Sequence, residues 1–320
     1  MLMLLGCLAI QAADDGLITN QVVINLDEPG TLPQKISASD KYLITNLKVK
    51  GDINGTDLGF LREMAGQSIN GIDETNGKLS TLDLSDTKIV GGGEPYFNYG
   101  GYETYFTEYN KIGKYAFCSC NNLKRLTLPK DITSIEQSAF FGCSGLTSIT
   151  IPSSVTAIGK WSFSYCSNLA NVTLSSNITS IGSSAFQDCS SLKNLTISKE
   201  VTSIKDIALN NSYNWLELES VYVAWENPIE AGSFFNRIKI SNCTLYVPQG
   251  TKEAYANADV WKDFGNIIEY DATGIDKVIN RSDVKEISRY SLNGQRVTSP
   301  TKGVNIVVYS DGSIKKVAVQ

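Results

Sequence analysis

The sequence contains no histidine among its 320 residues. Imidazole is the only side chain whose unperturbed charge changes near neutral pH, and it is the usual general base of nucleophilic hydrolases. Its absence excludes Ser-His-Asp and Cys-His catalytic sites, as well as zinc sites with histidine ligands. Only chemistry that uses carboxylate pairs, lysine or tyrosine is compatible with this composition.

The sequence also lacks a long apolar run and a basic cluster. Residues 1–10 are mostly apolar, and small, polar and acidic residues follow. A membrane-spanning helix needs about 20 apolar residues, so this stretch predicts a signal peptide over residues 1–12, with cleavage after Ala12. A lipid anchor on Cys7 is the alternative. The formal net charge is −5, and no segment predicts a nucleic-acid partner or a further membrane span.

Motifs for catalysis are missing as well. The sequence has no nucleophile elbow, P-loop or dinucleotide-binding motif. Acidic pairs exist at Asp83/Asp86 and Glu217/Glu219, but a glycosidase needs two carboxyl groups that face each other across a cleft, and spacing along the chain does not show this. We therefore predict a protein that is not an enzyme and that uses no cofactor or metal.

What the sequence does contain is a repeat of 23 residues. Three apolar positions recur at this interval: Ile112, Ile135, Ile158, Ile181 and Ile204; Phe117, Phe140, Phe163 and Phe186; Leu123, Leu146, Leu169 and Leu192. In each unit, apolar and polar residues then alternate, as in residues 126–128, which indicates a β-strand with one buried face. A strand that recurs once per unit stacks in parallel on its neighbours, so the repeat predicts a solenoid with one parallel sheet.

The same strand register continues on both sides of the clean units and predicts about eight stacked strands. The expected fold is an α/β or mainly β solenoid with short cap helices, over residues 56–65 and 251–264. The expected organisation begins with a capping region, which has irregular repeats and an insertion, over residues 17–110. The repeat array follows over residues 111–250 and a C-terminal cap over residues 251–270. A linker over residues 271–282 then leads to a small antiparallel β-module over residues 283–320.

The 23-residue unit resembles that of the BspA-like leucine-rich repeat proteins of bacteria. The segments GTDLGFLREM at residues 55–64 and LYVPQGTKEAY at residues 245–255 are similar to that family too. The resemblance implies a secreted or surface-exposed protein, and some members of the family are adhesins for host extracellular proteins. Residues 283–320 resemble a C-terminal β-module of exported Bacteroidetes proteins, which can act as a secretion or sorting signal; a plain β-cap is the alternative.

One cysteine occupies the same position in each of four units: Cys120, Cys143, Cys166 and Cys189. Metal clusters need ligands that converge, and a ladder with one residue per coil does not converge. Free cysteine suits small buried positions, so we predict that these thiols are buried where each coil turns. Disulfides between the units are not expected, and Cys118, outside this register, is expected to be partly exposed.

An aromatic insertion over residues 91–109 interrupts the repeat. It carries three glutamates and seven aromatic residues: Tyr96, Phe97, Tyr99, Tyr102, Tyr105, Phe106 and Tyr109. Tyrosine, glycine and asparagine on a loop are typical of binding surfaces, because the rings give large contacts at a low entropic cost. The alternative is that the aromatic side chains pack on a neighbouring coil. We predict a binding loop here.

The polar face of the predicted sheet is the second candidate site. Its expected contact residues project outward from successive strands: Arg125, Thr127, Asn171, Asn194, Tyr222 and Tyr246. A plain solvated sheet face is the alternative, because threonine is simply a good strand residue.

These features predict a secreted or cell-surface protein without catalytic activity that binds or adheres to a host extracellular protein or glycan. The predicted contacts are the sheet face and the tyrosine-rich loop. A carbohydrate-active enzyme on a β-solenoid and a structural surface-assembly protein are the alternatives. The sequence does not indicate the oligomeric state.

Overall fold

The computed structural model divides the chain into two units, residues 1–270 and 271–320. The predicted signal peptide, its Cys7 alternative and the predicted linker lie outside the described residues. The residues described are 16–175, 177–204, 208–209, 212, 216–270, 286–291, 296–297, 303–309 and 314–319.

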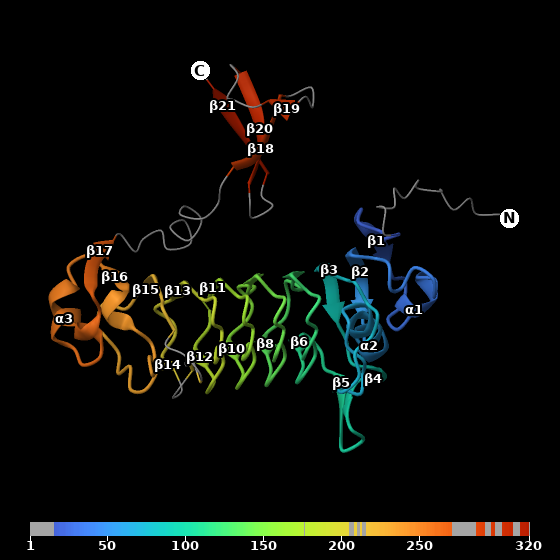
Figure 1. Ribbon diagram of the computed structural model, residues 1–320, viewed down its shortest axis with the longest axis horizontal. Helices are drawn as coiled ribbons and strands as arrows, with labels where there is room; N and C mark the ends of the chain where they lie inside the picture. Colours follow the sequence, from blue (N-terminus) through green and yellow to red (C-terminus); the bar gives the residue numbers. More distant parts are fainter. Residues whose placement is uncertain are drawn as a thin grey trace. The chain divides into compact units, whose positions relative to one another are not determined.

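The first unit is built on a ten-stranded parallel sheet, which confirms the predicted solenoid (Figure 1). In spatial order its strands are β1 (Val22–Asn25), β2 (Asn46–Ile53), β3 (Thr81–Ile89), β7 (Arg125–Thr127), β9 (Ser148–Thr150), β11 (Asn171–Thr173), β13 (Asn194–Ile197), β15 (Ser220–Val223), β16 (Thr244–Pro248) and β17 (Asn266–Tyr270). Within the array, Asn171 pairs with Ser148 and with Asn194, so each coil advances the register by one repeat. The two edge strands, β1 and β17, were not predicted, because their sequences do not follow the repeat register.

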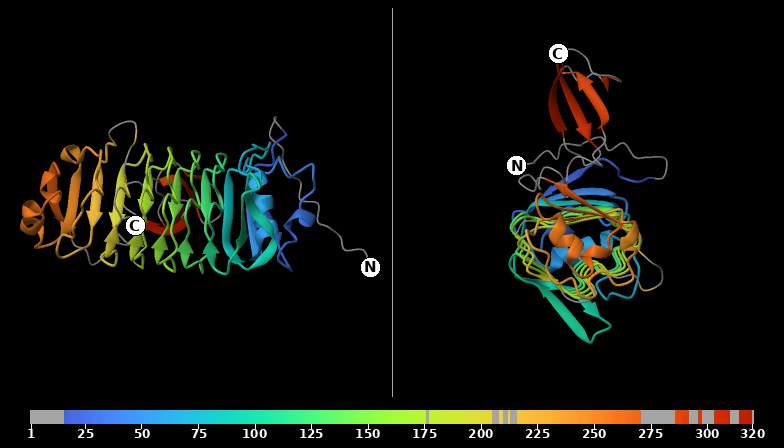
Figure 2. Two further views of the ribbon diagram at one scale, coloured as in Figure 1. Left: turned by 90° about the horizontal axis from the view of Figure 1, so that it is seen from below. Right: turned by 90° about the vertical axis from the view of Figure 1, so that its left-hand side faces the viewer.

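A second parallel sheet, which the repeat pattern did not predict, lies on another side of the coils. It has five strands of two residues each: β6 (Lys111–Ile112), β8 (Ser134–Ile135), β10 (Ala157–Ile158), β12 (Ser180–Ile181) and β14 (Ser203–Ile204). Figure 2 shows the coils in projection along the stack, with strands on more than one side. The expectation of a single parallel sheet was therefore wrong, because two residues are too few to show an alternating pattern.

Between the two sheets, the repeated phenylalanines form a continuous stack. Phe117, Phe140, Phe163 and Phe186 are all buried. Their successive ring centroids are 5.5, 5.0 and 5.3 Å apart, and the rings are nearly parallel. A coil cannot bury such a ring alone, so the stack makes each coil depend on its neighbours for stability.

The cysteine ladder joins each coil to the preceding one. Cys143 Sγ lies 2.9 Å from the carbonyl oxygen of Phe117, and the same contact recurs at 3.2 Å for Cys166 and at 3.1 Å for Cys189. All four ladder thiols are buried, as predicted, and Cys118 is partly exposed. The six described cysteines are free thiols. Burial raises the pKa of the Cys120 thiol to about 12.

The N-terminal region contains α1 (Leu32–Lys35) and α2 (Gly55–Met64), the second of which confirms the helix predicted at residues 56–65. A capping box begins α2: the Asn54 side chain accepts a hydrogen bond from the Thr56 amide, and the Asp57 carboxylate accepts one from the Asn54 amide. Asp57 is buried and also accepts hydrogen bonds from the amides of Gly30 and Leu32. One carboxylate therefore fixes both the start of the helix and the preceding chain.

The C-terminal cap differs from the single helix predicted over residues 251–264. The structure has α3 (Lys252–Asn257) and two 3-10 turns, η1 (Ile240–Asn242) and η2 (Trp261–Asp263). Helix α3 stops at Ala258, which is extended, and Val260 has a positive φ of 71°. This break allows Trp261, which is buried, to donate a hydrogen bond to the carbonyl of Ile229 at 2.7 Å.

The second unit contains a four-stranded antiparallel sheet, which confirms the β-structure predicted for the tail. Its order is β19 (Arg296–Val297), β18 (Glu286–Ser291), β20 (Gly303–Tyr309) and β21 (Ile314–Val319). None of the helices in the described residues is long and apolar enough to span a membrane.

Candidate functional site

The aromatic insertion is a β-hairpin rather than an irregular loop. Strands β4 (Gly92–Tyr99) and β5 (Glu103–Thr107) pair in antiparallel fashion. Gly100 and Gly101 have φ values of 56° and 81°, a backbone that glycine adopts without strain, and they make the turn. The hairpin projects from the coils on the side away from the ten-stranded sheet (Figures 1 and 2).

The seven aromatic side chains of the insertion divide into two groups. Four are exposed, by 57%, 90%, 52% and 70%: Tyr99, Tyr102, Phe106 and Tyr109. Tyr105 is partly buried, and Tyr96 and Phe97 are fully buried. The expectation that Tyr96 is a contact residue was therefore wrong, because its ring belongs to the core, and Phe97 is buried too, although it lines the groove described below.

The buried aromatic residues attach the hairpin to the repeat array. The Tyr96 hydroxyl donates a hydrogen bond to the carbonyl of Lys114 at 2.9 Å, and burial raises the pKa of this phenol. The Phe97 ring stacks on Tyr115 with centroids 5.1 Å apart. The Arg62 guanidinium also lies over the Phe97 ring, 4.7 Å from its centroid. The hairpin is thus a supported platform rather than a free loop.

A groove of about 700 Å³ lies between this hairpin and the turns of the neighbouring coils. The hairpin contributes Phe97, Tyr99 and Glu103. Four successive coils contribute the remaining aromatic residues and several polar groups: Tyr115, Cys118, Ser119, Ser138, Phe141, Trp161, Ser164, Tyr165 and Gln187. The site thus combines the predicted insertion with residues that no motif singled out.

These coil residues come from turns with an unusual backbone. Each coil has two left-handed positions, represented by Tyr115 and Ser119 with φ values of 59° and 60°, and by Trp161 and Tyr165 with values of 58° and 62°. Bulky residues seldom adopt this conformation, which costs about 1 kcal/mol or more per residue. The fold therefore maintains tyrosine and tryptophan at strained turn positions along the groove.

The groove wall is mainly aromatic, and its polar side chains differ in whether they have a hydrogen-bond partner. The rings of Phe141 and Tyr165 meet edge to face at 5.2 Å. Gln187 donates a hydrogen bond to Ser212 at 2.9 Å. The Ser164 hydroxyl is buried at the groove wall and has no hydrogen-bond partner in the part of the chain that the structure describes. Glu103 accepts a hydrogen bond from the hydroxyl of Tyr105.

A sequence signal for the groove did exist, although the repeat analysis did not use it. The fourth position of the unit is serine in two coils, Ser138 and Ser184, and aromatic in the other two, Tyr115 and Trp161. A large aromatic residue at a position where the core does not require one indicates a surface role. Only the coiling brings these positions into line with the hairpin.

The outward face of the ten-stranded sheet is a separate surface. Arg125 and Thr127 are exposed, but Asn171 and Asn194 are half-buried and hydrogen-bonded to each other at 3.0 Å. Tyr222 and Tyr246 are half-buried and stack at 4.2 Å. Because the hairpin projects away from this sheet, the structure does not bring the two predicted contact regions together.

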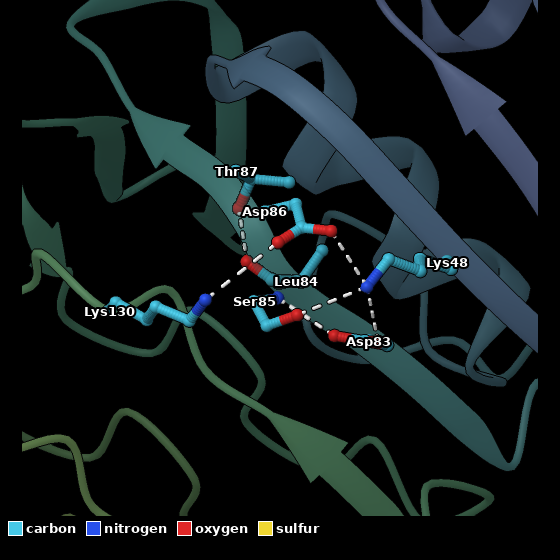
Figure 3. A network of polar contacts seen from close by, with 7 residues as sticks. All are labelled: Lys48, Asp83, Leu84, Ser85, Asp86, Thr87 and Lys130. Atoms are coloured by element: carbon cyan, nitrogen blue, oxygen red, sulfur yellow. Dashed lines mark hydrogen bonds and ion pairs between the residues drawn. The ribbon is translucent and has the colours of Figure 1, made fainter.

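The acidic pair Asp83/Asp86 is neutralised by lysine (Figure 3). Lys48 Nζ lies 2.9 Å from a carboxylate oxygen of each aspartate. The hydrogen bond from Lys48 lowers the pKa of Asp86. Burial opposes ionisation of Asp83, but hydrogen bonds from Ser85 and Lys48 outweigh it and lower its pKa too. A glycosidase acid needs a raised pKa, so this pair lacks the required electrostatics.

The second acidic pair is also matched with lysines. Glu217 lies 3.6 Å from Lys239, and Glu219 lies 3.8 Å from Lys193. All four side chains are substantially exposed, so these ion pairs stabilise the fold little. Among the described residues, no group of histidine, cysteine, aspartate or glutamate side chains is arranged to hold a metal ion.

Comparison with protein families identifies the array. Residues 104–216 match the model of the BspA type leucine rich repeat region in six copies. This stretch is a BspA-type leucine-rich repeat region. The sequence resemblance to that family is thus confirmed for the repeat region, whose coils form the long wall of the groove. A search of curated proteins finds no match to the chain.

Solved structures of bacterial leucine-rich repeat proteins are similar to this chain. The leucine-rich repeat protein of T. pallidum is 25% identical with a TM-score of 0.38, over 44% of this chain and 63% of its own. The pneumococcal vaccine antigen PcpA is 15% identical with a TM-score of 0.38, over 79% of this chain and 68% of its own. A leucine-rich cell surface protein of Faecalibacterium prausnitzii is 17% identical with a TM-score of 0.26, over 72% and 74%. This chain thus spans less than two thirds of the T. pallidum protein.

Proposed function

We propose that this protein is a secreted or surface-exposed binding protein of a bacterium, without catalytic activity, that adheres to a host extracellular protein or glycan. The observation that carries the proposal is the aromatic insertion with its hairpin β4–β5, in which four aromatic side chains are exposed and Tyr99 lines an open groove. The BspA-type repeat region supports it, because proteins with such repeats are found at bacterial surfaces.

The exposed aromatic residues are the expected main contacts. Large aromatic side chains dominate the energetics of protein interfaces, since they bury much area and lose little conformational entropy. Tyr102 at the hairpin turn is 90% exposed, a placement that does little for the stability of the isolated protein. The buried Tyr96 and Phe97 hold the hairpin in place, so its contact residues are pre-organised.

The outward sheet face is proposed as a secondary contact. Arg125 and Thr127 are exposed there, and the stacked pair Tyr222 and Tyr246 extends the surface toward the C-terminal cap. Asn171 and Asn194 satisfy part of their hydrogen-bonding capacity through each other, so they have fewer groups to offer a partner. We expect this face to contribute less than the hairpin.

The two ends of the chain are proposed to serve export. Cleavage after Ala12 would remove the signal peptide, and the antiparallel sheet of residues 286–319 would act as a sorting module. Mass spectrometry of the mature protein tests both assignments, because it distinguishes cleavage at Ala12 from a lipid on Cys7 and reveals any removal of the C-terminal sheet.

Adhesion of a hairpin variant tests the main proposal. Replacing Tyr99, Tyr102 and Tyr109 by serine removes exposed rings without opening the core, so the melting temperature should change little. Binding to immobilised extracellular-matrix proteins and to a glycan array should fall at least tenfold, about 1.4 kcal/mol. The matched control replaces the exposed Arg125 and Thr127 by serine and should change binding about twofold at most.

Two outcomes would contradict the proposal. The first is a folded hairpin variant that binds its targets as well as the unmodified protein. The second is a chain that binds no protein or glycan but self-associates in the ultracentrifuge, which favours a structural assembly role instead.

A further inference from the structure

We propose that the groove beside the hairpin binds an uncharged glycan chain that lies along the axis of the repeat stack. The assignment rests on the proposed binding function and gives it a ligand class. Three observations support it: the direction of the groove, the chemistry of the residues that line it and the charge of those residues.

The groove runs along the stack. Its wall takes one set of residues from each of four successive coils, from Tyr115 in the first to Gln187 in the fourth. Neighbouring parallel strands are about 4.8 Å apart, so three steps between four coils give a length of about 14 Å. A groove of this length suits several linked units of a polymer rather than a single small molecule. Its volume of about 700 Å³ is that of a ligand site.

The wall alternates ring faces with hydrogen-bonding groups. Sugar rings have an apolar face of C–H groups and an edge of hydroxyl groups, so they stack on aromatic side chains and exchange hydrogen bonds with amides and hydroxyls. Tyr99, Trp161 and Tyr165 offer partly or fully exposed rings, while Gln187 and Ser119 offer polar groups beside them. This combination matches the amphipathic character of a glycan better than that of a purely apolar ligand.

Ser164 offers a specific hydrogen-bonding site in this wall. Its hydroxyl is buried and has no partner among the described residues, whereas buried hydroxyl groups are normally hydrogen-bonded. The same repeat position holds Cys118, Phe141 and Gln187 in the other coils, so the core does not require serine here. A sugar hydroxyl at the groove surface would complete this bond.

The charge of the wall selects against anionic glycans. Glu103 is the one lining residue with a charge at neutral pH, and the described lining contains no lysine or arginine. Beside the wall, Lys160 Nζ lies 3.8 Å from the Trp161 centroid and is engaged with that ring, so a sulfated or sialylated chain would meet the Glu103 carboxylate without a cation among the lining residues. An uncharged chain meets no such repulsion and can hydrogen-bond to Glu103 through its hydroxyl groups.

The decisive variant is Trp161→Ser. At the same repeat position, Ser138 and Ser184 adopt the same left-handed backbone, with φ values of 55° and 56°, so the coil demonstrably accepts serine there. The variant therefore removes the ring while keeping the turn. Tyr42→Ser is the matched control, because it removes a partly exposed aromatic residue that neither lines the groove nor belongs to the aromatic insertion.

The assay is calorimetry with the full chain. The probes are chito-oligosaccharides, β-glucan oligosaccharides and N-acetyllactosamine oligomers of increasing length, with heparin fragments and sialyllactose as anionic probes. We expect one uncharged series to bind, with an affinity that rises with length until the groove is filled. Trp161→Ser should weaken this binding at least tenfold, Ser164→Ala several-fold, and Tyr42→Ser less than twofold.

Several results would overturn the glycan assignment. They are an absence of binding by every uncharged series, tighter binding of the anionic probes, selection of extended peptides in place of sugars, or unchanged binding by a folded Trp161→Ser protein. If adhesion to matrix proteins still depends on the hairpin tyrosines in any of these cases, the proposed function stands and only its ligand class fails. If the hairpin variant also adheres normally, both fail.

Discussion

The buried thiol ladder should make the protein unusually sensitive to alkaline pH. Desolvation raises the pKa of Cys120 to about 12, and it raises the pKa of Cys143, Cys166 and Cys189 well above the ordinary value of 9.0. In the unfolded chain, these thiols ionise near pH 9. Because only the unfolded state loses protons above that pH, the free energy of unfolding is unaffected below it and falls as the pH rises.

The size of the effect follows from proton linkage. A group that ionises at pH 9.0 only in the unfolded state lowers the free energy of unfolding by about 1 kcal/mol between pH 9 and pH 10. The four ladder thiols together therefore remove about 4 kcal/mol over this single pH unit, a large share of the stability of a typical domain. Buried tyrosines such as Tyr96 add to the loss mainly above pH 10.

Urea unfolding measures this loss directly. We expect the midpoint at pH 10 to lie far below that at pH 9 in the presence of a reductant. A variant with serine at all four ladder positions retains a donor for each carbonyl contact, while its hydroxyl groups do not ionise in this range. Its stability at pH 9 is expected to be lower, but its decrease from pH 9 to pH 10 should be about 4 kcal/mol smaller. An equal decrease in both proteins would refute the reasoning.

Three further predictions concern stability and are read from urea midpoints at neutral pH. Gly145→Ala places a β-carbon against the carbonyl oxygen of Asn121 and should lower the free energy of unfolding by about 3 kcal/mol or more. Gly142→Ala meets no close atom and should lower it by about 1 kcal/mol, because of its positive φ alone. Equal losses for the two variants would contradict this difference. Phe163→Ala removes a ring stacked on both sides and should cost about 4 kcal/mol, and a loss below about 2 kcal/mol would be inconsistent with the stack. Asp57→Asn weakens three contacts to backbone amides, two of them buried, and should cost about 3 kcal/mol, while a neutral effect would show that the carboxylate is dispensable.

Much of the fold could be predicted from the sequence, because the repeat fixes the spacing of identical environments. The isoleucine, phenylalanine and leucine positions are buried where the repeat indicates, except that Ile204 is only partly buried, and eight of the ten parallel strands follow from one register. The edge strands β1 and β17 escaped this reasoning, since each pairs on one side only and has no repeat around it. The break after α3 could not be foreseen either, because the packing of Trp261 imposes it.

The site was harder to predict than the fold. The density of aromatic residues marks the insertion, yet it does not reveal that Phe97 packs inward and that Tyr99 stays exposed. Phe97 and Tyr99 share one face of β4, so alternation does not separate them; Phe97 is covered by Tyr115 of the neighbouring coil, and Tyr99 lies beside the hairpin turn. The groove combines positions far apart in the chain, such as Glu103 and Gln187, and only the coiling brings them to one wall.

The hydrogen bond from each ladder thiol to the coil before it gives the protein an adjustable length. Cys143, Cys166 and Cys189 each bond to a carbonyl 26 residues earlier, so removing or inserting one whole 23-residue unit leaves every remaining thiol with an equivalent acceptor. The hairpin and the C-terminal cap would then move apart or together by about 4.8 Å per unit. The distance between the hairpin and the C-terminal cap can therefore change in fixed steps while the contacts inside the array stay the same.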